Sequence, residues 1–486
     1  MDDPNAAPSA DGRLRLSEPA GRWTLLVTAA GSGLVLLEAT VVTVALPALE
    51  RDLGASLTGL QWTVNAFTLT LSALILLGGA LGDRFGRRRM YLIGIAWFAA
   101  ASLLCGLAPT LEWLVAGRAL QGIGGALLVP GALALIQESF VPEDRNRALG
   151  WWSGLSGAAG AVGPLLGGAM VDTAGWRWVF LVNVPVAAAL AVVLGTRVPA
   201  RRSGARSGRF DVPGAALTAI GLGGITYALT DGAADPRATV AAAAIGVVAV
   251  VAFWRVERRS QSPMLPLAVF GSRTFAAANL AGFFLYGALA VLMFVLPIQL
   301  QISTGYSALT TGLALVPLTA LTLVLSARGG TLAGRLGPRV PMTVGSLACA
   351  VGLVLATRID PDASYLTEVL PAVVLVGIGI PLITPAITAS VLNAVADAHA
   401  GVAGAVSNGV ARAAGLLVVA ALPLLAGLPR YAADDPTALD RGFDHSMLIG
   451  AGLCVLGGIV AWFGLVETHP TTLRRTGASV SARTPP

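Results

Sequence analysis

The sequence predicts an all-α membrane protein of two six-helix bundles, with a two-helix insertion between them. Of its 486 residues, 55% are hydrophobic and only 12% are charged, whereas soluble chains carry about 25% charged residues. Apolar runs of about 20 residues, the length that crosses a bilayer, recur along the chain. A Gly- and Arg-rich loop motif occurs once in each half. Together these observations indicate a duplicated helical unit surrounded by lipid.

Fourteen segments are apolar and long enough to span a bilayer, which takes about 17–25 residues. They run near 23–47, 60–81, 90–108, 111–134, 148–171, 178–196, 212–231, 238–256, 275–298, 309–327, 341–357, 366–388, 402–428 and 445–466. The shortest of the later segments, 341–357, ends at Arg358. An even number of spans places both termini on one side of the membrane.

Arginine is unevenly divided between the two sides. The 32 basic residues are all arginines, and most lie in the N-terminal segment and in every second loop, such as 84–89, 197–209 and 255–273. Loops rich in basic residues face the cytoplasm. We therefore expect a multi-pass protein of the plasma membrane with both termini cytoplasmic.

The spans and polar stretches divide the chain into five parts. Residues 1–21 predict a disordered cytoplasmic tail, 22–198 the N-terminal six-helix bundle, 199–273 an inserted two-helix hairpin with polar linkers, 274–466 the C-terminal six-helix bundle and 467–486 a second cytoplasmic tail.

The repeated loop motif follows the second span of each bundle. Five residues match at constant spacing: Gly79, Leu81, Arg84, Gly86 and Arg88 pair with Gly330, Leu332, Arg335, Gly337 and Arg339. The second copy carries Gly334 where the first carries Asp83. Equivalent placement in the two halves favours duplication over chance identity.

Several other classes of protein are disfavoured. The loops are too short for a soluble domain, and they hold no phosphate-binding loop for ATP. The net charge of +6 belongs to cytoplasmic loops, so we expect no nucleic acid partner. Three cysteines lie singly in apolar runs and give no metal spacing. The histidines lie in loops or at span ends, which argues against an enzyme: His399, His445 and His469.

Five motifs resemble those of the major facilitator superfamily, in its branch of fourteen-span drug:proton antiporters. Residues 79–89 look like the signature loop, 118–124 like the fourth-helix basic motif and 176–185 like the start of the sixth helix. The fifth-helix antiporter motif is matched by Gly163, Pro164, Gly167 and Gly168. Residues 37–47 look like the first-helix motif, with two departures: Glu38 where Asp is usual, and Thr43 where Asn is frequent.

The resemblance implies a proton-coupled efflux transporter that exports small amphipathic molecules or drugs by alternating access. Its partners would be a small-molecule substrate, protons and the lipid bilayer. We expect a monomer with no cofactor, driven by the proton gradient. A dedicated exporter of one natural product or metabolite would carry the same motifs and stays open. A membrane-embedded enzyme is the less favoured alternative.

Glu38 and Arg118 are ionisable residues inside predicted spans, where a charge costs about 2.5–3.5 kcal/mol. Glu38 is the candidate proton carrier, because coupling needs an acid that gains and loses a proton. Arg118 keeps its proton, so its expected role is to bias a nearby carboxyl. The alternatives are a neutral hydrogen-bonded acid at Glu38 and a structural ion pair at Arg118.

The remaining candidates fall into three groups. The signature loop predicts a gate of Asp83, Arg84, Gly86 and Arg87, although ordinary inside-positive charge explains part of it. Two small-residue spacings in the fifth span, at Gly150 with Gly154 and at Gly163 with Gly167, predict close helix contacts. Polar residues at span depth are candidates for the substrate cavity: Asn65, Gln121, Gln299, Asn408 and Arg412.

Overall fold

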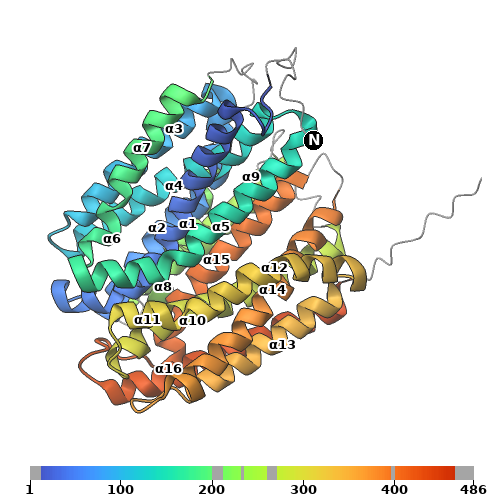
Figure 1. Ribbon diagram of the computed structural model, residues 1–486. Coiled ribbons are helices and arrows are strands. Elements are labelled where there is room, and N and C mark those ends of the chain that lie inside the picture. The colour runs from blue at the N-terminus through green and yellow to red at the C-terminus, as the bar shows by residue number, and fades with distance from the viewer. Residues whose placement is uncertain (1–12, 200–211, 231–234, 260–270, 396–399, 466–486) are drawn as a thin grey trace, which may run out of the picture.

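The computed structural model describes residues 13–199, 212–230, 235–259, 271–395 and 400–465 (Figure 1). Its helices are α1 (Pro19–Leu53), α2 (Leu57–Phe85), α3 (Arg87–Gly106), α4 (Leu111–Ser139), α5 (Pro142–Ala174), α6 (Arg177–Leu181), α7 (Asn183–Arg197), α8 (Val212–Thr230), α9 (Pro236–Arg259), α10 (Arg273–Ile302), α11 (Ala308–Ala314), α12 (Val316–Leu336), α13 (Arg339–Ala356), α14 (Leu370–Asn393, preceded by the π-helix Tyr365–Val369), α15 (Ala400–Ala426) and α16 (Pro436–Gly464).

Each of the fourteen predicted spans coincides with a helix or a pair of consecutive helices. In the described ranges, thirteen helical segments are long and apolar enough to cross a membrane. α8, a helix of 19 residues, occupies the seventh predicted span. The predicted linkers and tails at 1–12, 200–211, 260–270 and 466–486 lie outside the described residues. The all-α membrane fold is confirmed.

The helices form two halves, α1–α7 and α10–α16, which Figure 1 shows at upper left and lower right. In both halves equivalent helices pack together, such as α2 with α4 and α12 with α14. α8 packs on α9 and also touches α2 of one half and α15 of the other. The insertion therefore lies along the seam between α2 and α15.

The internal repeat of the sequence reappears as a repeated helix crossing. At each crossing two adjacent glycines of one helix face the partner helix. The first lies against a backbone carbonyl, and the second lies against a proline about one turn further along the partner helix. A Cβ atom at Gly79 would lie 3.6 Å from Pro130, and one at Gly330 would lie 3.8 Å from Pro385. The carbonyl contacts are Gly78 with Ala126 and Gly329 with Pro381.

The two halves meet at one end of the molecule. We call the end that holds the α2–α3 and α12–α13 loops the Arg-rich end, and the opposite end the Arg-poor end. Five sets of hydrogen bonds join the halves at or near the Arg-poor end: Leu57 N to Arg430 O (2.8 Å), Gln61 Nε2 to Val419 O, Gln301 Nε2 to Val44 O (2.9 Å), Ala433 N to Glu50 Oε1 (3.1 Å), and the amides of Ala308 and Leu309 to Asp172 (3.2 and 2.8 Å). The structure is closed at this end.

Candidate functional site

A buried carboxyl lies halfway along α1. Glu38 has no solvent exposure, and each of its oxygens accepts a hydrogen bond from a different helix. Arg118 Nη1 of α4 donates to Oε1 over 2.7 Å, and Asn183 Nδ2 of α7 donates to Oε2 over 2.6 Å. Three helices of the N-terminal half therefore converge on this one acid.

The guanidinium of Arg118 is held from several sides. Its Nε donates to the carbonyl of Thr63 over 2.9 Å, and Nη1 also donates to Gln121 Oε1 over 2.6 Å. The ring of Phe67 lies under it, with its centroid 4.4 Å from Cζ. This side chain is 1% exposed, so its position is fixed by protein contacts and not by water.

Gln121 completes the cluster and does not line an open cavity in this conformation. It is fully buried, and its Nε2 donates to Ser102 Oγ over 2.8 Å. It sits one turn after Arg118, the spacing that puts two side chains on one helix face. Its amide links the ion pair of Glu38 and Arg118 to α3.

The cluster suits an exchange of partners on protonation. A buried ion pair is costly to break on one side only, about 3–5 kcal/mol, because the remaining charge is left uncompensated. A proton on Glu38 removes the negative charge that holds Arg118 and turns one acceptor oxygen into a donor. Asn183 Oδ1 is buried without a partner among the described residues, so a flip of this amide would let Oδ1 accept that proton's hydrogen bond.

The antiporter-motif glycines lie where α5 crosses two other helices. A Cβ atom at Gly167 would lie 2.6 Å from Val41 Cγ2 of α1, and Gly163 similarly lies against Thr40. Gly168 instead faces the other half, where an added Cβ would lie 2.7 Å from Leu309 Cα of α11. The motif thus forms both a contact within one half and a contact between halves.

The close contacts predicted at Gly150 and Gly154 are absent from this structure. A Cβ atom added at either residue would find nothing within 4 Å. Both lie on the part of α5 toward the Arg-rich end, where the halves are apart. The prediction was wrong for this conformation, because residue spacing reveals a small-residue face but not whether a partner helix is seated on it.

The predicted gate residues cluster where α2 passes into α3. Arg87 contacts Asp83 through Nε and Nη2, over 3.0 and 2.9 Å, and donates from Nη1 to the carbonyl of Ala134 over 2.9 Å. Arg84 Cζ lies 5.5 Å from the centroid of the Phe85 ring. Gly86 separates the helices with φ of 95°, a conformation that favours glycine.

The five predicted cavity residues do not form one site. Asn65 is 1% exposed, and its Nδ2 has no partner among the described residues. Gln299 donates to Asp440 Oδ1 (2.7 Å) and to Ile359 O (3.1 Å) near the Arg-poor end. Asn408 is exposed on α15, and Arg412 lies one turn further along. Gln121 belongs to the Glu38 cluster.

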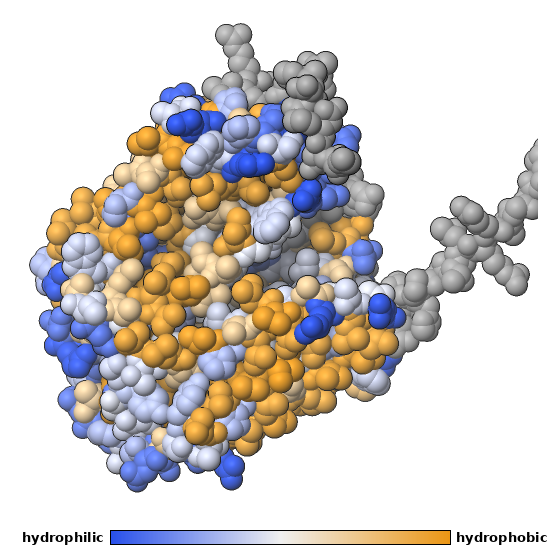
Figure 2. All heavy atoms as spheres, in the orientation of Figure 1, coloured by the Kyte–Doolittle hydropathy of each residue, from blue (hydrophilic) through white to orange (hydrophobic). Residues whose placement is uncertain are grey.

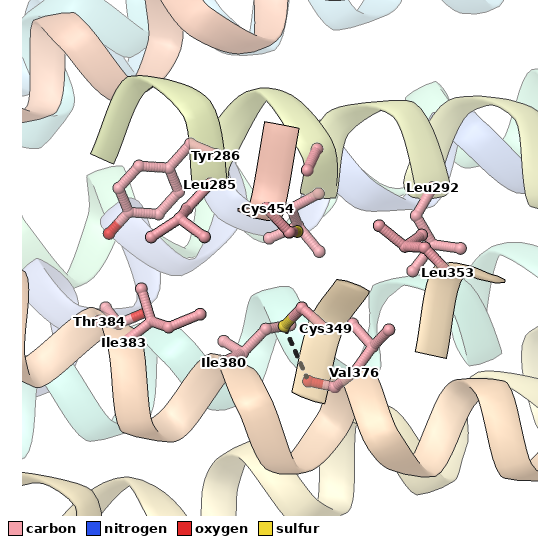
Figure 3. Close-up of a pocket in the computed structure, with 12 residues that line it drawn as sticks. Leu285, Tyr286, Leu292, Cys349, Leu353, Val376, Ile380, Ile383, Thr384 and Cys454 are labelled. Carbon is pink, nitrogen blue, oxygen red and sulfur yellow. Dashed lines mark hydrogen bonds between the residues drawn. The ribbon is translucent and has the colours of Figure 1, made fainter. Parts of the chain in front are cut away.

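A separate apolar cavity of about 30 Å³ lies inside the C-terminal half. Figure 3 shows side chains of α10 and α16 facing those of α13 and α14 across it, with Tyr286 and Thr384 at one end. The Cys349 thiol is directed at the carbonyl of Val376, 3.9 Å away. This space holds about one water molecule and is too small for a drug-sized substrate.

The sequence is similar to a known family and to several named proteins. Residues 28–420 match the family described as the Major Facilitator Superfamily. The chain is 38% identical to the puromycin resistance protein of Streptomyces alboniger, over 99% of both chains. It is 37% identical to the methylenomycin A resistance protein of Bacillus subtilis (80% of this chain, 84% of that one) and 36% identical to the tetracenomycin C resistance and export protein of Streptomyces glaucescens (83% and 75%).

Solved structures share the fold at low sequence identity. A bacterial homologue of the human lysosomal transporter Spinster, in an inward-facing conformation, matches with a TM-score of 0.67 and 16% identity, over 92% of this chain and 97% of that one. A D-xylose-proton symporter matches with a TM-score of 0.65 and 16% identity, over 92% and 98%. By its sequence and its fold, this chain belongs to the major facilitator superfamily.

Proposed function

We propose that this chain exports small amphipathic molecules from the cell in exchange for protons. The observation that carries the proposal is the buried Glu38 carboxyl, held by Arg118 and Asn183 where three helices meet. An ionisable group at membrane depth is a functional site by default. The relatives named as resistance and export proteins support export as the direction of transport.

The proposed energy source is the proton gradient, with no cofactor. One proton moving inward releases about 2.3 kcal/mol per 100 mV, enough for roughly a 50-fold substrate gradient at 1.4 kcal/mol per factor of ten. Glu38 would accept the proton on the extracellular side and release it to the cytoplasm. Arg118 would drive the release, because its positive charge favours the ionised carboxylate.

The proposed movement is a rocking of the two halves. With the Arg-rich end in the cytoplasm, both termini are cytoplasmic and the present conformation is inward-facing. Opening to the outside requires the bonds at the Arg-poor end to break and the cytoplasmic ends to close. The gate residues Asp83, Arg84, Gly86 and Arg87 would then contact the other half. A monomer in the plasma membrane suffices for this cycle, and no step makes it an enzyme.

Dedicated export of one natural product is the second candidate. It is favoured by the relatives named for resistance to a single antibiotic each, which include puromycin and methylenomycin A. The two candidates share the proton site and differ in the number of substrates. We therefore separate them by substrate range and not by mechanism.

Transport in proteoliposomes tests both candidates. Purified protein is reconstituted and given a pH gradient against a panel of cationic, neutral and anionic amphipathic compounds. We expect pH-driven transport of at least one compound, of several chemical classes for a multidrug exporter and of one for a dedicated exporter. Transport that persists unchanged after the gradient is collapsed with a protonophore would contradict proton coupling.

If Asp83 belongs to the gate, its substitution should slow transport without unfolding the protein. Asp83 and Arg87 are partly exposed, at 46% and 20% of their side chains, so their ion pair stabilises this conformation by only about 0.2–1 kcal/mol. Asp83→Asn should leave the melting temperature nearly unchanged while export falls clearly. Equal export by Asp83→Asn and the wild type would remove Asp83 from the gate. Asp360→Asn, at the Arg-poor end, is the control.

A further inference from the structure

A groove with two arginines lies on the C-terminal half, between α12 and α14. It has a volume of about 280 Å³. Two guanidinium groups and four aliphatic side chains are among its lining residues: Arg328, Arg335, Leu325, Leu332, Ile378 and Leu382. It opens on the side toward α13, because a Cβ atom at Gly345 of α13 would lie 3.0 Å from Leu382 Cβ.

This side of the C-terminal half faces the acyl chains. The helices that border the groove expose large aliphatic side chains, including Val324 of α12 at 62% and Val344 of α13 at 52%. Figure 2 shows the surface over α12, α13 and α14 as broadly apolar. Apolar side chains exposed to this extent on a membrane helix are solvated by lipid.

Arg328 therefore lies deep for a charged residue. α12 continues to Leu336, so Arg328 is eight residues, or about 12 Å, from the Arg-rich end of its helix. Arg335 is two turns further along on the same face, about 10 Å away. Within the described ranges, neither guanidinium hydrogen-bonds or pairs with another side chain. Both are exposed, so a ligand from outside the protein can reach them and supply a counter-charge.

The helix crossing itself does not require an arginine at this depth. In the repeated crossing of the N-terminal half, Gly78 is equivalent to Gly329 by its carbonyl contact, so Leu77 is equivalent to Arg328. The N-terminal copy packs in the same way with leucine there. Arg328 is thus a feature of this groove alone and points to a ligand.

We propose that the groove binds an anionic phospholipid. The headgroup phosphate would lie between Arg328 and Arg335, because a guanidinium binds phosphate oxygens through two parallel hydrogen bonds. One acyl chain would lie along Leu325, Leu332 and Ile378. The lipid comes from the leaflet at the Arg-rich end, the inner leaflet in the orientation proposed above. The aliphatic wall selects a lipid over a soluble phosphate.

Native mass spectrometry of the purified full-length protein tests this site. Dioleoyl phosphatidylglycerol is titrated against dioleoyl phosphatidylcholine, and inorganic phosphate is added as a competitor. Phosphatidylglycerol should bind the wild type with the tighter Kd. The variant Arg328→Gln/Arg335→Gln should bind it about 10- to 30-fold more weakly, because each arginine near an anionic lipid contributes about 1 kcal/mol.

The control variant Arg197→Gln/Arg259→Gln loses the same charge from exposed helix ends outside the groove and should bind like the wild type. Arg328→Lys/Arg335→Lys keeps the charge but loses the paired hydrogen bonds of the guanidinium. It should therefore bind phosphatidylglycerol more weakly than the wild type and more tightly than the glutamine variant, and its binding also shows that the helix crossing still folds. Equal loss in the groove and control variants would overturn the proposal. So would equal affinity for the two lipids, or displacement of the lipid by millimolar phosphate. None of these outcomes depends on the substrate or on proton coupling.

Discussion

Replacing Glu38 by glutamine is expected to abolish proton-driven export. The amide has the size of the acid but cannot carry a proton through the transport cycle. It can still accept a hydrogen bond from Arg118, and Asn183 can turn its unpartnered Oδ1 toward the new NH₂ group. In everted membrane vesicles, pH-driven uptake should fall to the background of empty vesicles. Exchange of substrate across the membrane without a gradient should persist.

Two further variants separate coupling from folding. Glu38→Gln leaves the Arg118 charge buried without its partner, a change that costs about 3–5 kcal/mol in buried pairs. Glu38→Gln/Arg118→Gln removes both charges and should recover much of the melting temperature while export stays uncoupled. Glu112→Gln, an exposed acid at the start of α4, should behave as the wild type. Undiminished pH-driven uptake by a well-folded Glu38→Gln protein would exclude Glu38 as the proton carrier.

The spans were predictable because the bilayer imposes one strong rule, an apolar length of about 20 residues. The ends of the helices were not predictable, because an apolar run ends at the first charged residue whereas the helical hydrogen bonds continue beyond it. The span predicted at 309–327 extends to Leu336, which moves Arg328 from a loop into a helix. The sixth and tenth spans also break, after Leu181 and Ala314. Pro185 and Pro317 follow these breaks, and neither can donate a backbone hydrogen bond.

The cluster around Glu38 was only partly predictable. Glu38 and Arg118 stood out singly, since charges inside apolar runs are rare, but one sequence carries no signal that residues from α1 and α4 meet. Asn183 was known only as part of a family motif. The rule that buried amides need partners applies to Asn183 as it does to Asn65 and Gln299, and would have found it. The prediction that Gln121 lines the substrate cavity missed its bond to Ser102. That bond depends on how α3 packs against α4, which the sequence does not reveal.

The closure at the Arg-poor end rests on a contact between backbones, which makes Gly168 the second sensitive position. Gly168 of α5 and Gly312 of α11 face each other's helices reciprocally. A Cβ atom at Gly168 would lie 2.7 Å from Leu309 Cα, and one at Gly312 would lie 3.0 Å from Leu165 Cα. No flexible side chain is available to move aside. Any larger residue must therefore push the two halves apart at this end.

Gly168→Leu is accordingly expected to disfavour the state that is closed at the Arg-poor end and to stop export. An overpacked contact costs about 1–3 kcal/mol, and a penalty on one state alone lowers its population about 5- to 150-fold. Spin labels at Arg51 and Asp434, beside the bond between Glu50 and Ala433, should report a longer distance than in the wild type. Proton-driven export should fall in parallel, and Gly168→Ala should give a smaller change in both.

Gly452→Leu is the matched control, because an added Cβ at this exposed position on α16 meets nothing within 4 Å. It should change neither the label distance nor export. If Gly168→Leu keeps the wild-type distance but loses export, the glycine acts within the N-terminal half and not at the closure. If it keeps both, the contact between α5 and α11 does not limit the cycle. The antiporter motif would then have to act through Gly163 and Gly167, which face α1 beside Glu38.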